Sequence, residues 1–230
     1  MALIASTTWN GGPISDGSPS PAINTTGATL LIVLNSSANA ASTITDSKGN
    51  TWTNLTTNDL TFSNFGRLSY VQNPTVGTGH TASATNNKQA SVFAAFDGTL
   101  TSGVFDQQNA GGHSSGLTTG VGSITPAQAA NLMIAGLIGL PGTSESIDSG
   151  YTLITGTRYV NNDHQGCFLA YLIQATATAQ NPTFTVGANG QQIGGVSASF
   201  NLAGGGGGTK AMPPFGRQFR PQFYSRKRVV

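Results

Sequence analysis

The chain is poor in charge. Only 8% of its 230 residues are Asp, Glu, Lys or Arg, whereas an average soluble domain has roughly 25%. A disordered chain would be rich in charge, and a coiled coil needs charged flanking positions, so this composition excludes both classes. Gly, Ser, Thr and Asn fill the gap. These residues favour tight turns between short strands, as in an all-β protein.

Cysteine and long apolar runs are also scarce. Cys167 is the only cysteine, which excludes an intrachain disulfide, and its apolar neighbours predict a buried core residue. The longest apolar run, residues 132–140, is too short to span a bilayer. The first residues, MALIASTTWNGG, lack the basic region and apolar stretch of a secretory signal. We therefore expect synthesis in the cytoplasm, no secretory export and no membrane partner.

Common motifs of catalysis and metal binding are missing as well. His80, His113 and His164 do not have the spacings of transition-metal ligands. There is no G-x-S-x-G motif, and the glycine run is not a P-loop because Thr209 separates Gly208 from Lys210. We expect a protein that is not an enzyme and has no catalytic, cofactor-binding or metal-binding residue. The many serines leave a Ser-His-Asp triad open, and two carboxylates in one cleft would indicate a glycosidase.

The stretch DSKGNTWT, residues 46–53, admits two interpretations. Asp46 and Asn50 carry oxygen ligands of the kind that Ca²⁺ accepts, but the further acids of an EF-hand-type loop are absent. We favour a turn in which the Asp46 carboxylate accepts N–H groups two or three residues on and Gly49 is left-handed. A shorter echo, DSGYTLI at residues 148–154, keeps the Asp and Gly.

That echo belongs to an internal repeat covering about residues 26–98 and 127–201. Four matches occur in the same order at spacings of 101 to 104 residues. They are LLIVL with LMIAG (residues 30 and 132), Asp46-Ser47 with Asp148-Ser149, LSY with LAY (residues 68 and 169), and VFAAF with VSASF (residues 92 and 196). The repeat predicts two structurally related halves.

Each half is rich in strand patterns. ATLLIVLN, residues 28–35, is a continuous apolar run, so both faces of this strand should be covered. With a first strand at ALIASTTW, about eleven short strands are expected, and NTWTNLTT (residues 50–57) is one of them. Residues 98–123, between the repeats, are rich in Gly and Ser but contain Val104, Phe105 and Leu117, so they are not a clean linker, and no strand is assigned to them. The predicted fold is one all-β, two-sheet antiparallel sandwich over residues 1–203, to which each repeat contributes half of the strands.

The order of these segments resembles a known family. TTGATLLIVL, DSKGNTWT, LSYVQNPTVGTG and SVFAAFDGTLTSGVFDQ, followed by a second half opening with AANLMIAGLIG, are similar to jelly-roll-like β-sandwich domains of tailed-phage virion proteins and bacterial surface proteins. The resemblance covers about residues 2–202. It implies a sandwich with a structural or adhesive role and brings no catalytic residues.

The end of the chain has a different composition. Before the glycine run there are four basic and eight acidic residues, a net charge of −4, and after it six basic and no acidic residues, a net charge of +6. We expect residues 204–208 to be a hinge and residues 209–230 an extended C-terminal arm. The 27 residues from Gly204 to Val230 would reach roughly 90 Å when extended. The predicted binding residues of the arm are aromatic or basic: Phe215, Arg217, Phe219, Arg220, Phe223, Tyr224, Arg226, Lys227 and Arg228.

The composition of this arm admits three interpretations. Aromatic and Arg residues are typical anchors at protein interfaces, which favours docking on protein. Stacking and phosphate neutralisation would suit single-stranded nucleic acid, and a free tail is the third reading. The leading hypothesis is a virion structural protein that decorates a capsid and binds the major capsid protein or another virion protein. We expect it to form a homo-oligomer, for example a trimer. The alternative is a glycan-binding module using Trp9, Trp52 or Tyr159.

Overall fold

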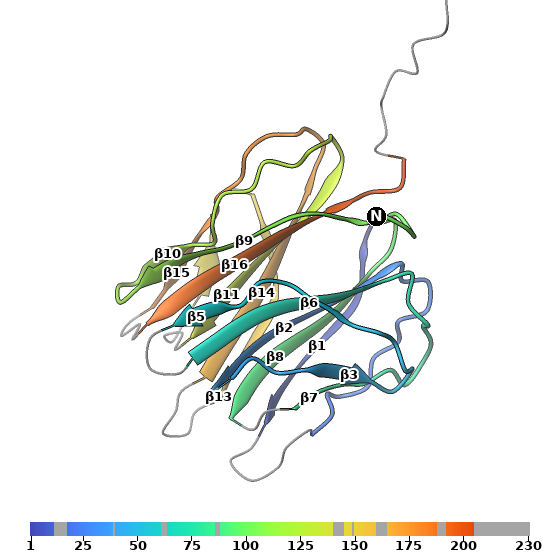
Figure 1. The fold of residues 1–230 in the computed structure, drawn as a ribbon, viewed down its shortest axis with the longest axis horizontal. Helices are drawn as coiled ribbons and strands as arrows, with labels where there is room; N and C mark the ends of the chain where they lie inside the picture. The colour runs from blue at the N-terminus through green and yellow to red at the C-terminus, as the bar shows by residue number, and fades with distance from the viewer. Residues whose placement is uncertain are drawn as a thin grey trace, which may run out of the picture.

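The protein folds as an all-β sandwich (Figure 1). A computed structural model describes residues 1–11, 18–38, 40–60, 64–85, 88–139, 145–148, 150–159, 165–187 and 192–204. Within these ranges all regular secondary structure is β-strand, and all strand pairs are antiparallel. The expected two-sheet antiparallel sandwich is therefore confirmed.

Two large sheets form the centre of the molecule. The first has the order β1 (Leu3–Gly11), β8 (Gln89–Phe96), β2 (Leu30–Ala38), β6 (Asn64–Gln72) and β4 (Thr53–Asn54), and β5 (Asn58–Leu60) also pairs with β6. The second has the order β13 (Thr152–Tyr159), β14 (Gln165–Gln174), β11 (Asn131–Gly139), β16 (Ile193–Asn201) and β9 (Phe105–Ser114).

A small sheet covers the outer face of each large one. On the first sheet it consists of β3 (Ile44–Asp46) and β7 (Ala82–Ala84), and on the second of β10 (Thr118–Gly120), β15 (Thr183–Val186) and β12 (Glu145–Ile147). The described residues therefore form three hydrophobic layers, one between the large sheets and one beneath each small sheet.

The three layers explain why the central strands are apolar on both faces. Along β2, Leu30, Ile32 and Leu34 contribute to the layer between the sheets, whereas Leu31 and Val33 contribute to the layer beneath β3 and β7. Side chains of a strand point alternately to its two faces, so a strand covered on both sides has to be continuously apolar. The expected burial of both faces is confirmed, since every residue of β2 and of β11 is buried.

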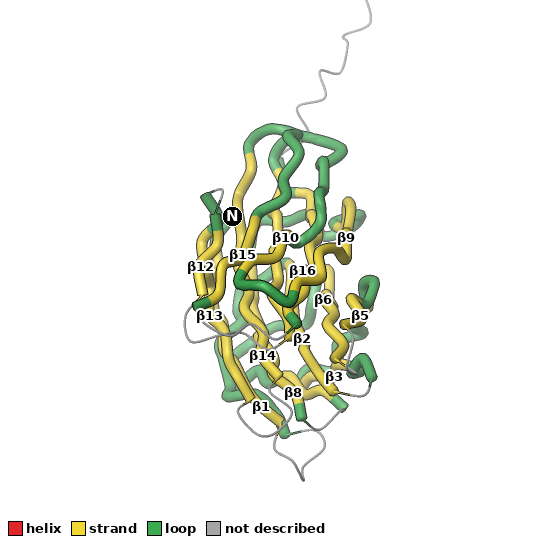
Figure 2. The backbone as a smooth tube through the Cα atoms, turned by 90° about the vertical axis from the view of Figure 1, so that its left-hand side faces the viewer, coloured by secondary structure: helices red, strands yellow, loops and turns green. Residues whose placement is uncertain are grey.

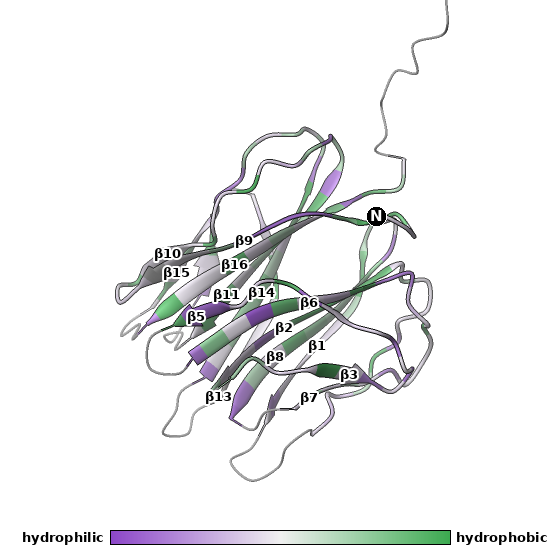
Figure 3. Cartoon of the chain, in the orientation of Figure 1, coloured by the Kyte–Doolittle hydropathy of each residue, from purple (hydrophilic) through white to green (hydrophobic). Residues whose placement is uncertain are grey.

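Polar residues replace apolar ones at one end of the sandwich, where the lower ends of β6 and β8 are hydrophilic in Figure 3. Asn35 donates to Gln89 Oε1 (3.0 Å) and Ser91 Oγ (2.8 Å), and Ser36 donates to Gln165 Oε1 (3.3 Å). All five side chains are buried. Buried polar groups are tolerated when they are hydrogen-bonded in this way.

The two large sheets have the same architecture. If β1, β2, β4, β6 and β8 are matched with β9, β11, β13, β14 and β16, the strand order of one sheet becomes that of the other. The register agrees as well, because Leu30 lies opposite Phe96 and Leu132 opposite Phe200. Each half of the chain thus forms one sheet with its covering layer.

Three details of the sequence interpretation were wrong. No strand is predicted for residues 98–123, but they contain β9, the counterpart of β1, and β10. The expected strand at residues 50–57 is broken, and only β4 and the nearby β5 form there. Sixteen strands are found among the described residues, against about eleven expected. Short edge strands and a glycine-rich strand have weak sequence patterns because tertiary packing decides whether they form.

Equivalent aromatic pairs join the two sheets. Tyr70 meets Phe200 edge-on with a 5.3 Å separation of ring centroids, and Tyr171 meets Phe96 in the same manner at 5.6 Å. The repeat relates Tyr70 to Tyr171 and Phe96 to Phe200, so each half supplies one Tyr and one Phe. The contacts between the sheets are therefore as symmetric as the sheets themselves.

Close packing between the sheets leads to a first prediction. A Cβ atom at Gly66 of β6 would lie 1.9 Å from Ile138 Cδ1 of β11. We expect Gly66→Ala to lower the free energy of unfolding by about 1–3 kcal/mol, because overpacking forces side chains or backbone to shift. Denaturant unfolding of the variant measures this loss.

The control is Gly116→Ala, whose added Cβ would meet only the Ser114 hydroxyl at 3.2 Å; it should cost much less. In an Ile138→Ala background the penalty of Gly66→Ala should shrink, since the clashing methyl groups are gone. An equal penalty in both backgrounds would contradict the packing argument.

Candidate functional site

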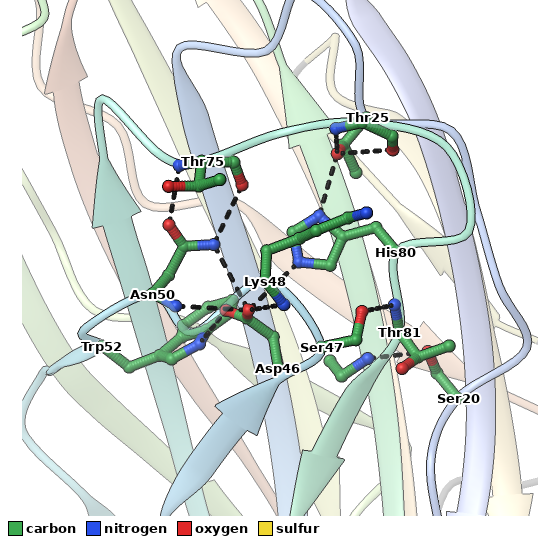
Figure 4. A network of polar contacts seen from close by, with 12 residues as sticks. Ser20, Thr25, Asp46, Ser47, Lys48, Asn50, Trp52, Thr75, His80 and Thr81 are labelled. Carbon is green, nitrogen blue, oxygen red and sulfur yellow. Dashed lines mark hydrogen bonds and ion pairs between the residues drawn. The ribbon is translucent and has the colours of Figure 1, made fainter.

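Among the described residues, a charged, an imidazole and a hydroxyl side chain meet where β3 ends (Figure 4). We call this group the Asp46 network; it comprises Asp46, His80 and Thr25 together with the donors around the carboxylate, Lys48, Asn50 and Trp52. The side chains of Asp46 and His80 are both 0% exposed, and so is Thr25. An Asp carboxylate at such a position needs several hydrogen bonds to replace water.

The Asp46 carboxylate obtains these bonds from its own turn. Oδ1 accepts from Lys48 N (2.8 Å), Asn50 N (3.3 Å) and Asn50 Nδ2 (3.3 Å), and Oδ2 accepts from Trp52 Nε1 (2.7 Å). Gly49 has a φ of +72°, in the left-handed region where glycine is favoured. The turn expected from DSKGNTWT is therefore confirmed, including the bond two residues on.

His80 is the member that the sequence interpretation treated as isolated. Its Nδ1 lies 2.8 Å from Thr25 Oγ1, and its Nε2 lies 3.4 Å from Asp46 Oδ1, longer than an ordinary hydrogen bond. A carboxylate only accepts, which favours the tautomer with the proton on Nε2 and with Nδ1 accepting from the Thr25 hydroxyl. That hydroxyl also lies 3.2 Å from Gly77 O. Thr25 Oγ1 in turn accepts from Gly77 N (3.1 Å).

Hydroxyl, imidazole and carboxylate thus stand in the order of a catalytic triad. A triad works only if a substrate reaches the hydroxyl, and here all three groups are buried. Asn50 also bonds Thr75 in both directions, accepting from its N (2.7 Å) and donating to its O (3.1 Å). The network therefore clamps three segments together, around residues 25, 46–52 and 75–80, which points to stability and not to catalysis.

Burial dominates the electrostatics of His80. It lowers the pKa of the imidazole, and nearby Lys48 acts in the same direction more weakly, whereas the Asp46 charge and its contact with the ring oppose the shift. Phe93 adds an apolar neighbour, edge-on at 5.3 Å between ring centroids. The net effect favours the neutral ring in the folded protein.

The second half has the turn but a different arrangement of side chains. Gly150 has a φ of +76°, like Gly49, but Asp148 is exposed and accepts from Thr183 N (2.7 Å). Tyr151 stands where the first half has Trp52, and burial, with a smaller contribution from Asp148, raises its pKa. The turn is therefore common to both halves, whereas the buried carboxylate is specific to the first.

Other sequence candidates lie apart from this network. Trp9 is 5% exposed, and Trp52 is half-buried and packs edge-on against Phe93 at 6.2 Å between ring centroids. Cys167 is fully buried, as expected, and burial raises the pKa of its thiol. Tyr159 belongs to β13 and His113 to β9.

His164 and the arm fall outside the described residues. The arm positions concerned are Phe215, Arg217, Phe219, Arg220, Phe223, Tyr224, Arg226, Lys227 and Arg228.

The described residues contain neither a metal-binding cluster nor a membrane-spanning helix. No group of three or more His, Cys, Asp or Glu side chains in these ranges is arranged to hold a metal ion. The same part of the chain has no helix that is long and apolar enough to cross a membrane.

Comparison of the chain with protein-family models, curated proteins and solved structures gives no match.

The Asp46 network generates a stability prediction with a built-in control. Asp46→Asn should lower the free energy of unfolding by about 2–3 kcal/mol, because hydrogen bonds to a charged group are lost and an amide N–H₂ faces other donors. Asp148→Asn, at the exposed counterpart, should cost about 1 kcal/mol or less. Denaturant unfolding of both variants decides; equal losses would contradict the assignment of Asp46 as the buried anchor.

A pH prediction follows from His80. The unfolded chain binds a proton at His80 near the ordinary pKa of 6.5, and the folded protein does so only at lower pH. Protonation therefore favours unfolding, so the contribution of His80 to stability is present above pH 6.5 and is lost as the pH falls from there through the folded pKa. Thermal unfolding between pH 7.5 and 5 should show this loss, and His80→Gln should flatten it. An unchanged slope in His80→Gln would assign the loss to other groups.

Proposed function

We propose that the protein is a non-enzymatic virion structural protein of a tailed phage, a decoration or cement protein of the capsid. The sandwich is the exposed body, and the basic, aromatic arm of residues 209–230 attaches it to the major capsid protein or to neighbouring copies. The proposal rests on the arm, whose composition differs from that of the body in charge and in aromatic content.

The body supports this proposal through the roles of its reactive groups. Asp46 and His80 are buried in the clamp described above, and Cys167 is buried between the sheets. These side chains have structural partners, such as Trp52 for the Asp46 carboxylate. A structural role therefore accounts for them without a substrate.

The root of the arm is well suited to anchoring. β16 lies between β11 and β9, and Leu202 N donates to Ala130 O (3.2 Å) just after it. Ala203 N donates to Gly98 O (2.8 Å), and the N-terminus lies at the same end of the molecule (Figure 1). A chain that leaves a central strand through such bonds transmits force directly to the core. This attachment suits an arm that holds a body on a particle.

A protein surface is the favoured partner of the arm. Four aromatic residues, Phe215, Phe219, Phe223 and Tyr224, alternate with six basic residues in a segment without acids. Aromatic and Arg side chains bury well in pockets and pair with acids at interfaces. The glycan alternative needs exposed aromatic rings. Trp9 is buried, and Trp52 is half-buried with its N–H bound to Asp46, which counts against both as sugar-binding residues.

Truncation of the arm tests the proposal. A chain ending at Ala203 should lose co-sedimentation with capsids of its own phage, because the anchor is absent, while circular dichroism shows that the sheets are retained. Replacing Phe215, Phe219 and Phe223 by Ser should weaken binding more than replacing Arg226, Lys227 and Arg228 by Gln if pockets dominate. Undiminished co-sedimentation of the truncated chain would refute the anchoring role. Absence of the protein from purified particles would refute the virion assignment.

A further inference from the structure

The repeat makes the two lateral sides of the sandwich equivalent. On one side the outermost strands are β1 of the first sheet and β13 of the second, which lie against each other; on the other side they are β5 and β9 (Figure 2). The repeat relates β1 to β9 and exchanges the two sides. Each position on one side therefore has an equivalent on the other, and the two sides can be compared strand by strand.

Among the described residues the side formed by β5 and β9 is closed, although β9 has ten residues and pairs only with β16. A bulge at Gly112, with a φ of +63°, interrupts β9, and the Thr119 hydroxyl binds Gly112 O (3.2 Å). The first sheet ends there in two very short strands, β4 with two residues and β5 with three. Main-chain groups at this side are bound by side chains of the opposite sheet. Gln108 Oε1 accepts from Thr56 N (2.7 Å), and Asn58 Nδ2 donates to Gly111 O (3.1 Å) and Gly195 O (2.7 Å).

The side formed by β1 and β13 is open. Here both sheets end in long strands, β1 with nine residues and β13 with eight. Within the described residues, β1 pairs only with β8 and β13 only with β14. After a bulge near the start of each strand, pairing is regular over Ala5–Gly11 and Thr155–Tyr159. Thr157 Oγ1 of β13 donates to Asn10 Oδ1 of β1 (2.9 Å), and within the described residues the outer main-chain edge of each strand is not paired with a further strand.

These edges carry little of the protection that edge strands normally have. Natural edge strands avoid pairing with other chains by being short, charged or interrupted by proline. β1, with the sequence LIASTTWNG, has no charged residue and no proline, and β13, TLITGTRY, has Arg158 as its only charge. An edge strand of this kind is a template for a further antiparallel strand.

We propose that a second copy of the chain occupies this edge, forming a two-fold symmetric dimer in which both large sheets continue across the interface. A two-fold axis perpendicular to the sheets keeps each sheet in its own layer and reverses the strand direction. The β1 strands of the two copies then meet antiparallel, and so do the two β13 strands. One operation therefore satisfies both open edges.

The chemistry of the edge favours a second copy over another partner. Two-fold pairing places β1 beside itself, and an uncharged strand does so without bringing like charges together. β13 carries one charge, Arg158, next to its last residue, so antiparallel pairing about the middle of the strand puts the two copies of this residue at opposite ends. Antiparallel pairing is also the arrangement of every other strand pair described. The inference stands apart from the virion proposal, because it uses the body and not the arm, and it replaces the trimer considered from the sequence with a dimer.

Mass and cross-linking of the full chain test the dimer. Light scattering should give twice the 23.4 kDa of the chain at micromolar concentration. Ala5→Cys and Thr7→Cys should be cross-linked to dimers by a short bismaleimide, because β1 lies at the two-fold axis. Gln107→Cys on β9, the counterpart of Ala5, is the control on the closed side and should stay monomeric. Buried Cys167 does not interfere, as the unmodified chain will show.

Other outcomes overturn the proposal. A monomer or trimer by light scattering, or equal cross-linking at Ala5 and Gln107, would show that this edge does not pair with a second copy. Proline at Thr7 or Thr8 provides a further check, because one of these two successive N–H groups points away from β8. Of these two variants, the one that retains the β-sheet signal in circular dichroism should be monomeric. A folded variant that still dimerises would contradict pairing through this edge. If the protein dimerises but does not bind particles, the virion proposal is refuted and the dimer is not.

Discussion

Burial of both faces of β2 and β11 is the constraint on which the rest of the structure depends. Each of these strands contains a continuous apolar run, residues 30–34 in β2 and residues 132–139 in β11, so neither could remain in a sheet with one wet face. Pairing the two large sheets covers the inner faces, and the small sheets cover the outer ones. The aromatic pairs of Tyr70 and Tyr171 then fix how one half lies on the other. The layered architecture follows from this need to cover hydrophobic surface.

The Asp46 network shows how the first half secures its covering layer. A small sheet of two short strands has little hydrophobic area of its own, and a buried carboxylate with four donor contacts ties it to neighbouring loops. The second half buries Phe184 and Val186 under a three-stranded layer and leaves Asp148 exposed. Related halves have thus reached the same shape by polar anchoring in one case and apolar packing in the other.

The features that suggest a function lie at the periphery of the molecule. The side chains that resemble a catalytic triad are occupied in the clamp, which leaves the arm and the open edge of β1 and β13 as the features without a structural explanation. The two differ physically. An arm binds through aromatic and basic side chains, whereas a strand edge binds through the main chain and requires a partner of extended conformation. A virion protein that decorates a particle would use the arm for attachment and the edge for self-association.

The sequence by itself determined the all-β class, the repeat, most of the long strands and the Asp46 turn, because alternation, apolar runs and turn residues act over a few neighbouring positions. It predicted no strand at residues 105–114, since a glycine-rich segment becomes β9 only by pairing with β16. It also separated His80 from Asp46, which lie 34 residues apart in the chain and meet only when β3 and β7 pair. Tertiary structure decided which edge stays open and which reactive groups are buried, because both depend on contacts between distant segments that no local pattern encodes.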